Sequence, residues 1–222
     1  MVTHTWDRIA VLCLAVLLGS TVSNAALVFE NPWNSAASDA GAFSQPSQMF
    51  AGRFSLVGEA SVDRATWYGT MFSDDPLDTG DTWSFDIVFR TDAAGLPGTV
   101  LSTSAVVASV TDTGLDVTGE RAYLFDASFA DVALAGGTSY FMSAINTGAP
   151  WTFRWNLGLD AAYLSYLSED GGASWGHDSS RPMVNFALYD EGVGPVVPAP
   201  GALLLAGLGF STATWLRRRG TL

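Results

Sequence analysis

Residues 81–90 read Asp-Thr-Trp-Ser-Phe-Asp-Ile-Val-Phe-Arg, and the order of apolar and polar side chains in this stretch decides the fold class. From Trp83 to Phe89 every second residue is large and apolar, and Val88 is the one interruption of the intervening polar series. Successive side chains of a β-strand point to opposite faces of the sheet, so a period of two is typical of a strand that buries one face. The stretch therefore predicts a half-buried β-strand.

Segments of the same kind recur along the chain and are separated by clusters of Gly, Pro, Asp and Ser. Further strands are predicted in 64–72, 123–129, 138–145, 151–155 and 183–189, and turns in 74–80, 94–98, 112–119, 135–137, 148–150 and 169–176. No segment between them combines a long 3.6-residue apolar stripe with helix caps. We therefore expect an all-β fold, an antiparallel β-sandwich of the jelly-roll kind, with helices confined to a signal segment and a membrane anchor at the two ends.

The N-terminal segment has the features of a secretory signal peptide. Ile9 to Gly19 is apolar, Arg8 precedes it, and Ser23-Asn24-Ala25 supplies small residues at a cleavage site. We predict a signal peptide over residues 1–25, which would remove Cys13 with it. The alternative is an uncleaved membrane helix, for which the apolar segment is short.

The C-terminal segment has three parts. Val197-Pro198-Ala199-Pro200 is followed by an uncharged run, Gly201 to Leu216, and then by Arg217, Arg218 and Arg219. A helix of about 16 residues spans roughly 24 Å, less than the ~30 Å hydrocarbon core of a bilayer. Consecutive arginines mark the cytoplasmic side of a membrane segment. The pattern predicts a marginal transmembrane helix that anchors an extracytoplasmic body.

This tail resembles the PEP-CTERM sorting segment of surface proteins in Gram-negative bacteria that produce exopolysaccharide, in a Pro-Ala-Pro variant with Ala199 where the family usually has Glu. The resemblance implies processing by an exosortase-like membrane protease and delivery to the cell surface. The segments 65–70, 85–89, 95–98 and 134–140 also resemble the β-sandwich ectodomains that precede such tails, for which no activity is implied. The alternative is a plain membrane anchor without processing.

These observations divide the chain into a signal peptide (1–25), one β-sandwich ectodomain (26–193), a linker (194–197) and a sorting or anchor segment (198–219). Between residues 26 and 198 there are 21 acidic residues against 6 arginines, a net charge of −15, with no lysine and no cysteine. The absence of cysteine excludes disulfides, thiolate nucleophiles and cysteine zinc sites from this region. So acidic a surface also argues against nucleic acid as a partner.

Exposed aromatic side chains would suit an extracellular polysaccharide, because sugar rings stack on indoles. Trp151 and Trp155 occupy one face of a predicted strand, and Trp175 ends the sequence Ser-Glu-Asp-Gly-Gly-Ala-Ser-Trp of residues 168–175. We consider these three tryptophans candidate sugar-binding residues, with Trp33 a lesser one. The alternative is that they belong to the core.

The 168–175 sequence resembles the Asp-box motif of sialidase propellers and other β proteins. It occurs once, and about 170 residues are too few for an ordinary propeller. The physical content of the motif is a turn: Asp170 accepts backbone N–H bonds, Gly171 and Gly172 take positive φ, and Trp175 folds onto the core.

A loop of carboxylates offers a candidate metal site. Asp74, Asp75, Asp78 and Asp81 supply the hard oxygen ligands that calcium prefers, although their spacing is not that of an EF-hand. Solvated turn residues are the alternative. No other cofactor is expected.

Catalytic patterns are scarce. His177 is the single histidine after the signal segment, no Gly-x-Ser-x-Gly sequence occurs, and only 174–178 places Ser, His and Asp together. We therefore expect a non-catalytic structural or adhesive protein of the cell surface and polysaccharide matrix, with a carbohydrate-binding module as the alternative.

Overall fold

A computed structural model describes residues 25–35, 42–71, 82–148, 153–158 and 164–192 of the chain. They belong to one compact unit, Ala25–Gly192. The predicted signal peptide and sorting tail, the acidic loop that holds Asp74, Asp75, Asp78 and Asp81, and Trp151 all lie outside the described residues. No helix long and apolar enough to cross a membrane occurs in the described part of the chain.

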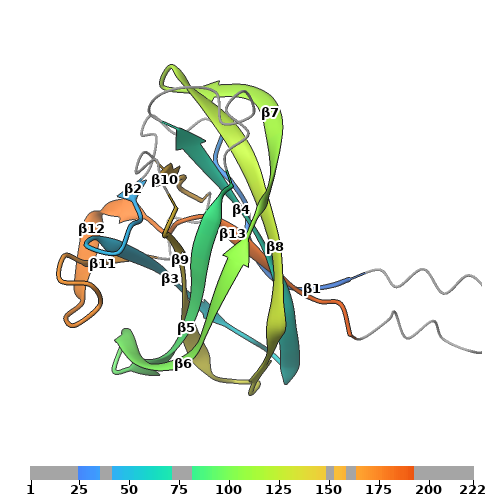
Figure 1. Cartoon of the computed structure of the whole chain (residues 1–222). Helices are drawn as coiled ribbons and strands as arrows, with labels where there is room; N and C mark the ends of the chain where they lie inside the picture. The colour runs from blue at the N-terminus through green and yellow to red at the C-terminus, as the bar shows by residue number, and fades with distance from the viewer. Residues whose placement is uncertain (1–24, 36–41, 72–81, 149–152, 159–163, 193–222) are drawn as a thin grey trace, which may run out of the picture. The chain divides into compact units, whose positions relative to one another are not determined.

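The described residues form two antiparallel sheets, which confirms the all-β, two-layer expectation (Figure 1). The seven-stranded sheet contains β1 (Ala26–Asn31), β13 (Phe186–Asp190), β4 (Ala60–Met71), β10 (Phe153–Trp155), β2 (Ala42–Phe43), β8 (Glu120–Leu134) and β7 (Ser109–Val117). The six-stranded sheet runs in the order β12 (Gly176–Pro182), β11 (Leu164–Ser168), β3 (Met49–Ser55), β9 (Ser139–Asn146), β5 (Ser84–Ala93) and β6 (Leu96–Val107). The jelly-roll connectivity and the two terminal helices stay predictions.

Aromatic side chains from both sheets fill the space between them. Phe85 of β5 meets Phe125 of β8 and Phe153 of β10 edge to face, with ring centroids 5.4 and 5.0 Å apart. Trp67 of β4 stacks on Phe125 at 5.8 Å. All four are buried, and burying each large apolar side chain contributes about 1.5–3 kcal/mol, so this cluster holds the sheets together.

The stretch that predicted a strand from its alternation is strand β5. Phe85, Ile87 and Phe89 are buried between the sheets, as their spacing indicates. Val88 faces the other way and is also buried, because β5 is an inner strand between β9 and β6. The one break in the alternation is thus a buried position on the outer face of the six-stranded sheet.

The turn predicted over 112–119 is wrong in extent. Strand β7 continues to Val117, and the turn consists of Thr118 and Gly119, whose φ angles are 53° and 84°. A register shift between Asp112 and Asp116 accommodates the extra residues as a bulge against β8. The polar residues and the glycine of this segment belong to the bulge. A bulged strand and a loop have similar compositions, so composition alone does not distinguish them.

Candidate functional site

A row of outward-facing positions crosses five strands of the seven-stranded sheet. In register, Glu30 of β1 lies beside Ala187 of β13, Ala187 beside Thr66 of β4, Thr66 beside Asp126 of β8, and Asp126 beside Ser109 of β7. The two central residues are small, and a carboxylate stands on each side of them. The centre of the sheet is therefore the floor of a groove, with a volume of about 220 Å³.

One end of the groove is aromatic. Trp33, two residues beyond β1, stacks on Tyr68 of β4 with ring centroids 4.7 Å apart and an interplanar angle of 18°. Trp33 forms a β-bridge with Gly158, and Asn185 hydrogen-bonds the backbone of Tyr68, so both rings are fixed at their main chains. Each ring is half-buried. The pair forms a wall that lines the groove.

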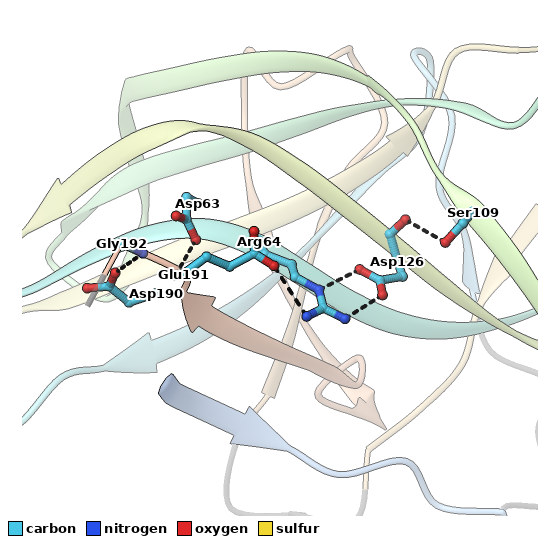
Figure 2. Close-up of polar contacts among 7 residues, drawn as sticks. All are labelled: Asp63, Arg64, Ser109, Asp126, Asp190, Glu191 and Gly192. Carbon is cyan, nitrogen blue, oxygen red and sulfur yellow. Dashed lines mark hydrogen bonds and ion pairs between the residues drawn. The ribbon is translucent and has the colours of Figure 1, made fainter. Parts of the chain in front are cut away.

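The other end of the groove is charged and tightly paired. The Arg64 guanidinium donates to both oxygens of Asp126, from Nε at 2.8 Å and from Nη2 at 2.6 Å, and its Nη1 reaches Glu191 at 3.3 Å (Figure 2). The guanidinium also lies over the ring of Tyr189, 5.2 Å from its centroid. Bidentate bonding and ring contact together fix its plane.

This pairing favours the charged form of the Arg64 guanidinium. Hydrogen bonding to Asp126 raises the pKa of the Arg64 guanidinium above its ordinary value, although partial burial acts in the opposite direction. Glu30, across the floor, is exposed and makes no hydrogen bond or ion pair with any described residue. The groove therefore presents one compensated charge pair and one carboxylate ready to accept hydrogen bonds.

The arrangement suits a ligand with an apolar face and several hydroxyl groups. An aromatic wall can stack against the C–H face of a pyranose ring. Carboxylate oxygens accept hydrogen bonds from hydroxyls, and the Thr66 side chain on the floor both donates and accepts. Ligand sites in proteins typically combine apolar walls with a few placed polar groups in this way.

Trp155 is a core residue, which corrects its selection as a sugar-binding candidate. Its side chain is fully buried, and its Nε1–H donates to the backbone oxygen of Asn185 at 2.6 Å. No face of the indole is left for a ligand. The period-two spacing that suggested an aromatic platform instead marks the inward face of β10.

Trp175 lies on the outer face of the six-stranded sheet, whereas the groove lies on the seven-stranded sheet. It is half-buried and packs against a small cluster formed by Ala51, Phe141 and Tyr166. The guanidinium of Arg90 lies 5.4 Å from its ring centroid. The side chains of this cluster and the Arg90 guanidinium therefore cover much of the Trp175 ring.

The 168–175 segment is a turn between β11 and β12, as its sequence predicted. Asp170 accepts from the backbone N–H and the hydroxyl of Ser174 at 2.9 and 2.6 Å and from the hydroxyl of Ser168 at 2.8 Å. Gly171 and Gly172 have φ angles of 71° and 89°. These bonds, above all the one from the Ser174 hydroxyl, lower the pKa of Asp170 to about 2. The Asp170 carboxylate therefore holds the turn in shape through these hydrogen bonds.

The same bonds show how the Ser and His side chains of 174–178 are used in the structure. Ser174 and His177 line one open hollow, but the Ser174 hydroxyl donates to Asp170. His177 instead meets the ring of Tyr166 edge to face at 5.6 Å. The described geometry is that of a turn and its packing.

The acidic loop proposed for calcium cannot be placed, since it falls outside the described residues. Among the residues that the structure does describe, no group of three or more His, Cys, Asp or Glu side chains converges as a metal site.

The groove itself was missed in the sequence, although part of its signal was present. Arg64, Thr66 and Tyr68 are the polar-face positions of a predicted strand. Their neighbours Asp126 and Ala187 come from strands distant in sequence, and only the register brings them together. A search of known protein families and of characterised proteins found no match to the chain.

Proposed function

We propose that the chain is an exported, non-catalytic surface protein whose β-sandwich binds polysaccharide in the groove of the seven-stranded sheet. The observation that carries the proposal is the Trp33–Tyr68 wall at one end of a floor of small side chains, with the carboxylates of Glu30 and Asp126 on the two sides of that floor. An aromatic surface and hydrogen-bond acceptors around one groove match the apolar face and the hydroxyl groups of a sugar ring.

Charge selects among polysaccharides. The chain carries a formal net charge of −12, and in the groove Arg64 is compensated by Asp126 and Glu191. A polymer rich in uronic acids would be repelled by this surface. We therefore assign the groove to a neutral, hexose-based polysaccharide.

Affinity electrophoresis of the full chain in detergent tests the assignment. The probes are a neutral galactomannan and, in parallel, an acidic alginate. The parent chain is expected to be retarded by the neutral polymer alone. Trp33→Ala should weaken retention about tenfold, equivalent to roughly 1.4 kcal/mol of lost stacking. If neither polymer nor any other neutral glycan on an array retains the parent, polysaccharide binding is wrong.

Two further variants separate the groove from other surfaces. Trp175→Ala removes an indole on the opposite sheet and should leave retention unchanged; if it abolishes retention instead, the β11–β12 turn is the binding site. Glu30→Gln alters an exposed carboxylate that contacts no described residue, so the fold should persist while retention falls. A thermal melt of each variant identifies any loss that comes from unfolding.

The cellular location of the protein is proposed from its N-terminal and C-terminal segments. The signal features of residues 1–25 support export, and the Pro-Ala-Pro, apolar and triple-arginine parts of the tail support sorting by an exosortase-like protease after a transient membrane stage. In this proposal a sandwich of the jelly-roll kind is displayed at the surface of a Gram-negative cell. There it contributes to a polysaccharide matrix as a structural or adhesive component.

A further inference from the structure

Exposed apolar side chains gather on one strand. Seven large hydrophobic residues are exposed among the described residues, and four of them, Leu96, Val100, Leu101 and Val107, belong to β6. Val107 is 65% exposed and Leu101 47%. Single exposed apolar residues are ordinary, but a row of them on one strand is the usual mark of an interaction surface.

Strand β6 is the last strand of the six-stranded sheet. Among the described strands it hydrogen-bonds to β5 alone, so the backbone N–H and C=O groups of its other side have no strand partner. From Ser102 to Val107 its register with β5 is regular, whereas the bulges lie further toward Pro97. The regular part is therefore an unpaired backbone edge on which another strand can pair.

Natural sheets protect their edges with charge, shortness, proline or bulges. The other edge strands of the molecule use these devices: β1 carries Glu30, β7 carries Asp112 and Asp116, β12 carries His177 and Asp178, and β2 has two residues. In contrast, no charged residue occurs between Asp92 and Asp112, an interval that contains the whole of β6. Among the described edge strands longer than two residues, β6 alone has no charged residue, and its proline and bulges lie outside the regular part, Ser102 to Val107.

The outward face of β6 is also suited to pairing with itself. Exposure alternates regularly from Leu101 to Val107, so Leu101, Thr103, Ala105 and Val107 form one uncharged row of apolar and small side chains. In an antiparallel pair related by a two-fold axis, such a row meets an identical row running the other way. Two copies of so acidic a chain repel one another at most surfaces, and an uncharged edge is where close approach costs least.

We propose that β6 pairs antiparallel with β6 of a second copy of this chain, which joins the two six-stranded sheets into one continuous sheet. The contact surface is the free edge from Leu101 to Val107. It lies on the sheet opposite the groove, so the proposal is independent of polysaccharide binding.

The test introduces charge on the edge. Ala105→Asp places a carboxylate opposite the partner's strand, and light scattering of the full chain in detergent should show the dimer dissociation constant rising at least tenfold. Thr111→Asp puts the same charge on the exposed face of β7, the edge of the other sheet, and should leave the dimer intact. Association through the tail would survive both changes, so a dimer unaffected by Ala105→Asp overturns the proposal, as does a parent chain that is monomeric at tens of micromolar.

A distance measurement gives a second, independent readout. In a Cys13→Ser background the chain has no cysteine, so a nitroxide label on Thr103→Cys reports only on the introduced site. Paired β6 strands bring the two labels within the range of dipolar electron resonance, and Thr111→Cys serves as the control. Dipolar coupling from Thr111→Cys without any from Thr103→Cys would place the interface elsewhere and overturn the β6 assignment.

Discussion

The side-chain amide of Asn185 pairs with the backbone of Tyr68 as a neighbouring strand would. Its Oδ1 accepts from the Tyr68 N–H at 2.7 Å, and its Nδ2 donates to the Tyr68 oxygen at 3.1 Å. Strands β13 and β10 follow one another along the same side of β4, the first ending its pairing at Thr66 and the second at Gly69. Asn185 fills the interval between them.

Asn185→Ala should therefore destabilise the sandwich by about 1–3 kcal/mol, because it leaves the partly buried N–H of Tyr68 unpaired; the Tyr68 oxygen keeps its bond from the backbone N–H of Asn156. Urea unfolding followed by tryptophan fluorescence measures the change. Asn185→Asp is a sharper variant of the same size, since it keeps an acceptor for the Tyr68 N–H but sets an oxygen against the backbone oxygens of Tyr68 and Asn156. Equal stability of Asn185→Asp and the parent would show that the amide donors contribute nothing.

The Arg64–Asp126 pair should have a measurable coupling energy. Each side chain is less than a third exposed and the bonding is bidentate, so a double-mutant cycle of Arg64→Ala and Asp126→Ala is expected to give about 1 kcal/mol, decreasing with added salt. The Arg121–Asp112 pair, in which the arginine is 50% exposed, is the matched control and should give less. A coupling larger for the control pair would contradict this account.

Asp170 should make stability depend on acidic pH. Its pKa is about 2 in the folded chain against an ordinary 3.8, so the unfolded chain binds the proton first as the pH falls. The stabilising effect is complete above about pH 4 and is lost between pH 4 and pH 2. Thermal melts of the parent and Asp170→Asn should differ by a constant amount at neutral pH and converge in this window. A difference that persists unchanged at pH 2 would exclude Asp170 as its source.

Removing Trp155 should lower the free energy of unfolding more than removing Trp175. Trp155→Ala deletes a fully buried indole and is expected to lower the free energy of unfolding by about 3–5 kcal/mol. Trp175→Ala deletes a half-buried indole that packs on the outer face of a sheet, and should cost clearly less. Denaturant titration of both proteins decides the order, and the reverse order would contradict the placement of Trp155 in the core.

The tail offers a test of topology. Each arginine costs about 2.5–3.5 kcal/mol at the bilayer centre, so Arg217, Arg218 and Arg219 should prevent the short apolar run from being drawn through the membrane. Changing all three to Ser is expected to release the protein with its tail intact. Changing Pro198 and Pro200 should instead leave it in the inner membrane, because the prolines keep the cleavage region out of the helix.

Mass spectrometry of the C-terminal peptide distinguishes these outcomes. If parent protein recovered from the outer surface still contains Trp215 to Leu222, processing of the tail is wrong and anchoring alone remains.

Local patterns predicted those parts of the fold that depend on local chemistry. The alternation around Phe85 is the burial pattern of β5, and the Ser168–Ser174 segment forms the turn that its Asp and Gly residues require. Strand β6 was not anticipated, because an edge strand buries little and its sequence shows no strong alternation of apolar and polar residues.

The groove depends on register, which sequence does not display. A shift of one residue between β4 and β8 would turn Asp126 to the opposite face and away from Arg64. Trp155 was placed among the sugar-binding candidates because a period-two aromatic row has the same sequence whether it faces solvent or the opposite sheet. Only the packing of Phe153 against Phe85 and Phe125 decides between the two.

The position of β13 has a mechanical consequence. The tail follows this strand directly in the chain, so any pull from an anchor enters the sandwich at Gly192. The backbone N–H of Glu191 is held by Asp63 at 2.8 Å, and β13 is paired on both sides, with β1 and with β4. Tension along the strand therefore loads these hydrogen bonds together in shear. Strands β1, β13 and β4 also carry the floor and the aromatic wall of the groove. A force between a bound polymer and the anchor would therefore be transmitted through these three adjacent strands, and the rest of the sandwich would bear little of it.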